Sequence, residues 1–162
     1  MLIETGFELP FPIEQSWEFL QDFTRVAACV PGAALTEIVN ERQAKGQLTI
    51  RLWVLKLRCG GVVTVIEHEE SHRVVVRAEA ANEGVAGKVR DTMTSTLAAS
   101  GDGTVVSVTH DIEAFGGLAN YGRAVTGIVL SVLTKQFSRC VAAKIQEGAN
   151  QEVEGPEPSL GY

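Results

Sequence analysis

His110 and two strand acids are the side chains of this sequence best suited to acid–base chemistry. His110 shares its strand parity with Val106, so it should face the interior, where an imidazole could donate to a ligand carbonyl or act as a base. Asp91 and Asp111 would lie nearly opposite each other if their strands pair through the Ser100–Gly103 turn. A structural role is the favoured interpretation for all three: a histidine with satisfied hydrogen bonds, and acids that face solvent.

The other candidate groups give weaker signals. His68 and His72 flank a turn at residues 69–71, where a metal could bind but solvated turn residues are the expectation. Gly84–Lys88 lacks the spacing and the following helix of a phosphate-binding loop. We therefore assign no catalytic residue and no metal site.

The three cysteines, Cys29, Cys59 and Cys140, are odd in number and far apart. Their spacing does not match a metal site or a redox motif. We expect reduced thiols in a cytoplasmic compartment. Cys29 has no histidine near it in the sequence to activate it, so we expect it to be a small buried hydrophobe.

The elements that must position these groups follow from periodicity. Alternation predicts a strand at Leu2–Leu9, and apolar spacings of three and four predict a helix at Pro12–Gln21. Asp22 can cap a second short helix at Thr24–Ala28. Six strands should follow, with a bulge or bend at Gly60-Gly61. These strands are expected at Leu35–Asn40, Ala44–Val54, Leu55–Glu69, His72–Ala81, Lys88–Ala99 and Thr104–Glu113.

A long helix is predicted at residues 120–147, after a loop at Phe115–Leu118. Nine of its residues should form one broad apolar face. Gly148 should end it, so residues 1–147 would form one domain and residues 148–162 a flexible acidic tail. The nine face residues are Val125, Ile128, Val129, Val132, Gln136, Phe137, Cys140, Val141 and Ile145.

This order predicts an α+β fold in which a curved seven-stranded antiparallel sheet surrounds one long helix. A helix about 40 Å long covers only a strip of a sheet roughly 30 Å wide, so an apolar cavity should remain. The alternative is that the same residues form only a packed core. The predicted cavity residues are Phe23, Val26, Leu48, Ile50, Leu52, Val63, Val76, Met93, Leu97, Val106, His110, Ile128, Val132 and Phe137, with a mouth near Phe115 and Leu118.

The net charge of the chain and its distribution limit the kinds of partner that the protein can bind. The 162-residue chain has a net charge of -6, and four of those charges belong to the tail from residue 147 onward. A nearly neutral body argues against nucleic acid, which requires a basic stripe. No signal peptide is visible, and the most apolar stretch, Ala124–Leu133, is well short of the roughly 20 residues that span a bilayer.

Several motifs together are typical of one family. They are Phe7, Pro12, Trp17, Leu20, Asp22, Val26-Ala27, Cys29, Pro31-Gly32, Gly46, Leu48, Thr104, Val106, Asp111, Phe115-Gly116-Gly117-Leu118-Ala119 and Gly122. Over residues 3–146 the chain resembles the carbon monoxide dehydrogenase G-subunit family, within the START-like superfamily of helix-grip folds.

The resemblance implies a helix-grip fold with a hydrophobic ligand and a role beside a molybdenum-containing carbon monoxide dehydrogenase or related hydroxylase. Members of the family are linked to recruiting the enzyme to the membrane and to carrying quinone. The short acidic tail here lacks an apolar anchor. We therefore expect a cytoplasmic protein that is at most peripheral to the inner face of the membrane, with transient contact through the cavity mouth.

Three functions are compatible with this sequence. The favoured one is a non-enzymatic protein that binds a quinone or lipid and assists the hydroxylase, with no intrinsic cofactor. The second is an enzyme of the polyketide cyclase or aromatase kind, and the third is an assembly factor without a ligand. The interior offers few polar groups for catalysis, which favours binding.

Overall fold

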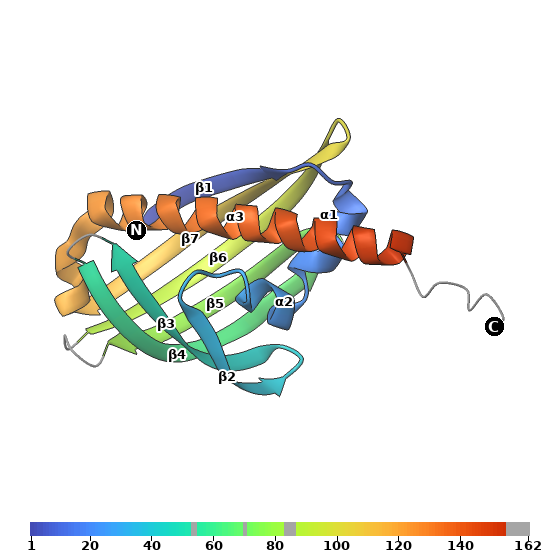
Figure 1. Ribbon diagram of the computed structural model, residues 1–162. Helices are drawn as coiled ribbons and strands as arrows, with labels where there is room; N and C mark the ends of the chain where they lie inside the picture. Colours follow the sequence, from blue (N-terminus) through green and yellow to red (C-terminus); the bar gives the residue numbers. More distant parts are fainter. Residues whose placement is uncertain (53–54, 70, 83–86, 155–162) are drawn as a thin grey trace.

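Seven antiparallel strands form one curved sheet in the order β1-β7-β6-β5-β4-β3-β2, and the long helix α3 lies across its concave face (Figure 1). The computed structural model describes residues 1–52, 55–69, 71–82 and 87–154. The predicted helix-grip arrangement is confirmed. The elements are β1 Leu2–Leu9, α1 Ile13–Leu20, α2 Phe23–Ala27, β2 Ala33–Asn40, β3 Gln43–Leu52, β4 Leu55–Glu69, β5 Arg73–Asn82, β6 Gly87–Ser100, β7 Gly103–Gly116, the 3-10 helix η1 Gly117–Tyr121 and α3 Gly122–Glu154.

Capping sets the limits of the two short helices. Pro12 is the N-cap of α1 and has extended backbone (φ -57°, ψ 154°), so the helix begins one residue after the predicted start. The Asp22 carboxylate accepts hydrogen bonds from the backbone N–H groups of Thr24 at 3.0 Å and Arg25 at 3.3 Å, as the sequence predicted for α2. The Asp22 cap satisfies amide groups that α2 itself leaves unpaired.

A bulge or a bend was predicted at Gly60-Gly61, and the strand register excludes the bulge. The β3–β4 and β4–β5 registers run through both glycines without a shift, and the irregularity in β4 lies between Val65 and Glu67. Gly61 is needed for another reason: a Cβ there would collide with the backbone carbonyl of Glu79 on β5. The glycine allows two strands to approach closely where the sheet curves.

Helix α3 continues past the predicted end at Gly148 to Glu154. Gly148 does not have a positive φ, so it does not adopt the left-handed conformation of a helix-ending glycine. A glycine inside a helix costs only about 1 kcal/mol, which neighbouring residues can offset. The first seven residues of the predicted tail, Gly148–Glu154, are therefore helical, and residues 155–162 lie outside the described part of the chain.

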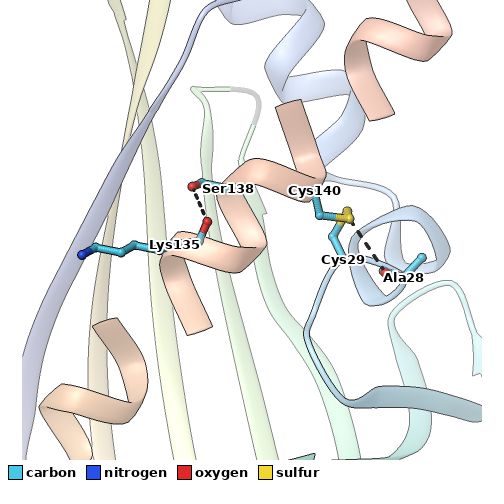
Figure 2. Close-up of a disulfide and its surroundings, with 5 residues drawn as sticks. All are labelled: Ala28, Cys29, Lys135, Ser138 and Cys140. Carbon is cyan, nitrogen blue, oxygen red and sulfur yellow. Dashed lines mark hydrogen bonds between the residues drawn. A yellow bond between two sulfur atoms is a disulfide. The ribbon is translucent and has the colours of Figure 1, made fainter. Parts of the chain in front are cut away.

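A disulfide joins Cys29, in the segment after α2, to Cys140 on α3 (Figure 2). Their Cα atoms are 5.3 Å apart, although 111 residues separate them in sequence. The prediction of reduced thiols is therefore wrong for this pair, because the fold brings together cysteines that no spacing rule connects. Cys29 is buried, as expected, and Cys59 is a free, buried thiol. The cysteines give no argument for a reducing compartment.

The sealed core lies at one end of α3. It consists of Leu9, Phe11, Phe19, Cys29, Leu97, Val106, Val141 and Ile145, with Val26, Phe137 and others packed against it. Val141 and Ile145 belong to the C-terminal half of α3, which lies beside α1 at one end of the sheet (Figure 1). The N-terminal half of α3 lies at the opposite end of the sheet, and its apolar side chains are less completely buried.

Candidate ligand site

The N-terminal half of α3 borders an open groove of about 600 Å3. Two of its apolar side chains remain uncovered: Ile128 is 49% exposed and Val125 is 38% exposed. Val141, in the sealed half of the same helix, is 0% exposed. Among described residues the groove is lined by Arg123, Ala124, Gly127, Ile128, Ser131 and Val132.

Helix geometry explains the difference between the halves. At 3.6 residues per turn, nine residues rotate a side chain by two and a half turns, so Val132 lies opposite Val141. The single apolar face predicted from Val125 to Ile145 is therefore wrong. Apolar residues occupy more than one side of the helix, and those on the Val141 side of its C-terminal half are packed into the core.

The inner face of the sheet is apolar but incompletely covered. Register and alternation place Val63, Val76 and Met93 on the same face as the buried pair Leu97 and Val106. All three are only half-buried. The same holds for Leu48, Ile50 and Leu52 on β3. An apolar face that keeps partial access to solvent is the usual lining of a small-molecule site.

The predicted cavity residues thus fall into several groups. Ile128 and Val132 line the groove. Leu97, Val106, Val26 and Phe137 belong to the sealed core or pack against it. Phe115 is 52% exposed at the end of β7, whereas Leu118 is 8% exposed in η1 and Phe23 is half-buried in α2. Contact of these residues with a ligand stays a prediction.

One buried polar cluster interrupts the apolar inner face. His110 Nδ1 lies 2.7 Å from Asp91 Oδ2, and His110 Nε2 lies 3.1 Å from the hydroxyl oxygen of Thr5. The three residues come from β7, β6 and β1, and His110 is 7% exposed. Both imidazole nitrogens have a partner, which confirms the interpretation of His110 as a satisfied histidine.

Asp91 and Asp111 lie nearly opposite each other, as predicted, but they are offset by one residue. Asp91 lies opposite Ile112, and Asp111 lies opposite Thr92. Because side chains alternate between the faces of a sheet, Asp91 faces inward and Asp111 faces outward. The Asp111 side chain is 58% exposed and lies 3.7 Å from the N-terminal amine. The hairpin register could have revealed the Asp91–His110 contact, since the two are diagonal neighbours on one face.

His68 and His72 contact Trp17 instead of forming a metal site. The His68 ring stacks on the indole at 5.2 Å between centroids, and the His72 ring meets it edge-on at 5.5 Å. His68 Nε2 also lies 3.0 Å from Gln21 Oε1. Within the described ranges, no group of three or more His, Cys, Asp or Glu residues could hold a metal ion.

The family model for the carbon monoxide dehydrogenase G-subunit (CoxG) matches residues 6–146 of this chain. The match spans most of the sequence, from β1 to the C-terminal half of α3. The chain belongs to the CoxG family. The comparison with curated proteins finds no match.

Solved structures support the same fold for this CoxG-family chain. A conserved protein from Geobacillus kaustophilus has a TM-score of 0.80 at 20% identity, with 91% of this chain and 96% of the other covered. A START superfamily protein from Mycobacterium smegmatis has a TM-score of 0.66 at 10% identity, with coverage of 90% and 97%. The Zhui aromatase/cyclase from Streptomyces sp. R1128 has a TM-score of 0.56 at 13% identity, with coverage of 94% and 95%. At these identities the likeness establishes the fold alone.

The part of the CoxG-family chain that the structure describes contains no helix with the length and apolar character needed to cross a membrane.

Proposed function

We propose that this protein binds a quinone or another lipid between α3 and the inner face of the sheet, and that it assists a molybdenum-containing carbon monoxide dehydrogenase or a related hydroxylase. The protein would hold the ligand without transforming it. CoxG family membership supports the enzyme partner, and the fold is one that binds hydrophobic ligands.

The uneven packing of α3 carries this proposal. Its C-terminal half is sealed against the core, while the N-terminal half leaves Ile128 half exposed beside a groove of about 600 Å3. Exposed apolar area has a cost of roughly 25 cal/mol per Å2, so a ligand that covers this side would be bound favourably. A groove of this volume is in the range of small-molecule sites.

An enzyme of the cyclase or aromatase kind is the second candidate, and the Asp91–His110 pair is the observation that favours it. A carboxylate 2.7 Å from an imidazole is a common arrangement for a general base. However, both nitrogens of His110 are occupied, and the ring is 7% exposed. Ligand binding does not require a histidine with an unoccupied nitrogen, so a binding function fits this site better than catalysis.

The test is native mass spectrometry and organic extraction of protein purified from its own host, comparing wild type with Gly127→Phe. Gly127 lines the groove and has open space where a Cβ would stand, so a phenyl ring there should occupy the ligand's volume. We expect wild type to retain a quinone or lipid and the variant to lose most of it.

Gly148→Ala is the matched control, because it changes a glycine of the same helix at the sealed end. Its added Cβ would lie at an ordinary 3.8 Å from the Arg25 side chain. This variant should retain the ligand like wild type. Wild-type protein that is free of lipid and takes none up from vesicles would contradict the proposed function.

A further inference from the structure

The Asp91–His110–Thr5 cluster contains one polar atom that has no partner. Asp91 Oδ2 contacts His110 Nδ1, but the second carboxylate oxygen, Oδ1, is buried and has no hydrogen-bond partner among the described residues. A buried carboxylate oxygen without a donor is unfavourable, because folding removed its hydrogen bonds to water. This atom is therefore suited to receive a donor from a ligand.

The protons of the cluster can be assigned from its contacts. An ionised carboxylate can only accept, so His110 Nδ1 carries the hydrogen that it donates to Asp91. In a neutral imidazole Nε2 is then an acceptor, and the Thr5 hydroxyl donates to it at 3.1 Å. Whichever group donates between His110 Nε2 and Thr5, the hydrogen-bonding capacity that remains on Asp91 Oδ1 is that of an acceptor.

The side chains that face Asp91 from the neighbouring strand are small. The residue opposite Asp91 on β5 is Ala78, and the next residue on the same face is Ala80. These are small side chains, and the Asp91 side chain keeps 16% of its surface exposed. Asp91 is the fifth residue of β6, whose first residue, Gly87, pairs with Gly116 directly before η1.

We propose that Asp91 binds the head group of the ligand and selects one that donates a hydrogen bond, such as a phenol, a hydroquinone or an alcohol with an apolar tail. This inference rests on the proposed binding function. A quinone carbonyl, an ester or an ether offers only acceptors and leaves Oδ1 unpaired. For a quinone-type ligand, the site therefore holds the reduced, hydroxylated form more tightly than the oxidised form.

The experiment compares a long-chain para-alkylphenol with its methyl ether by isothermal titration calorimetry on the whole protein. The two probes share the ring and the tail, and the ether lacks only the donor hydrogen. A hydrogen bond to a charged group predicts that the phenol binds about tenfold more tightly, or more. Equal binding of the two probes would overturn this inference and leave the proposed function standing. Binding of neither would contradict both.

The variant Asp91→Asn tests whether Asp91 Oδ1 is the atom that accepts the hydrogen bond from the ligand. The amide oxygen can still accept from His110, and the amide nitrogen replaces Oδ1 with a donor. The preference for the phenol should therefore fall to within about twofold. Asp111→Asn is the matched control, because it makes the same change one strand away on the outer face, and it should keep the wild-type preference. An unchanged preference in Asp91→Asn would also overturn the inference.

Discussion

Reducing the Cys29–Cys140 disulfide should lower the free energy of unfolding substantially. The bond closes a loop of 111 residues. The chain-entropy relation gives about 4.8 kcal/mol for a loop of this length at 25 °C, which is near the upper end of measured values. For a chain of this size 1 kcal/mol corresponds to roughly 2–4 °C, so the melting temperature should fall by about 10–20 °C.

The assay is thermal and urea unfolding with and without a reductant. Alkylation and intact-mass measurement should count one free thiol in the oxidised, denatured protein and three in the reduced one, since Cys59 is free. Cys140→Ala should match the reduced wild type and should no longer respond to reductant. Cys59→Ala is the control, and it should keep the full difference between the oxidised and reduced forms.

Two results would refute this reasoning. Three alkylated thiols in protein prepared under oxidising conditions would show that the two cysteines are not joined. A reduced wild type that unfolds at the temperature of the oxidised form would show that the bond does not restrict the unfolded chain as the loop length requires.

Three further perturbations follow from single contacts. Gly61→Val should lower the free energy of unfolding by at least about 3 kcal/mol, because its Cβ would collide with the Glu79 carbonyl. Gly60→Ala should change it by less than about 0.5 kcal/mol, because nothing lies within 4 Å of the added Cβ. Equal losses for the two variants in urea titrations would contradict this prediction. Asp22→Ala should cost about 1 kcal/mol in the same titration, because two amides of α2 lose their acceptor, and an unchanged midpoint would exclude the cap as a stabilising contact. Gly127→Ala should raise the stability by about 0.8 kcal/mol, because it removes a helix-interior glycine in open space, and a loss of stability would mean that the position is not open.

Local patterns were sufficient for most of the secondary structure. Alternation predicted the bounds of β1 as observed, and the Asp22 cap placed α2 within one residue. The Ser100–Gly103 turn lies where its glycines indicated, with Gly101 at φ 57°. These features depend on residues close together in sequence, so their physical cause is visible in the sequence itself.

The hydrophobic pattern did not predict how the long helix α3 packs, because its two halves lie in different surroundings. The apolar residues of α3 suggested one face, but the helix packs its two halves differently, with Val141 buried and Ile128 exposed. The periodicity of a sequence shows which residues of a helix are apolar. It does not show which side of the helix the sheet or another helix covers. The glycine at position 148 was also ambiguous, because the same residue can end a helix or lie inside it.

The site depended most on tertiary structure. Residue types alone singled out His110, Asp91 and Cys29, and the family motifs predicted the helix-grip fold. The hairpin register could place Asp91 and His110 on one face and Asp111 on the other, because side chains alternate along a strand. Only the folded chain showed that the Asp91 and His110 side chains meet at 2.7 Å. Likewise, only the packing of α3 against the segment after α2 brings Cys140 to Cys29 across 111 residues, a distance at which sequence spacing carries no geometric information.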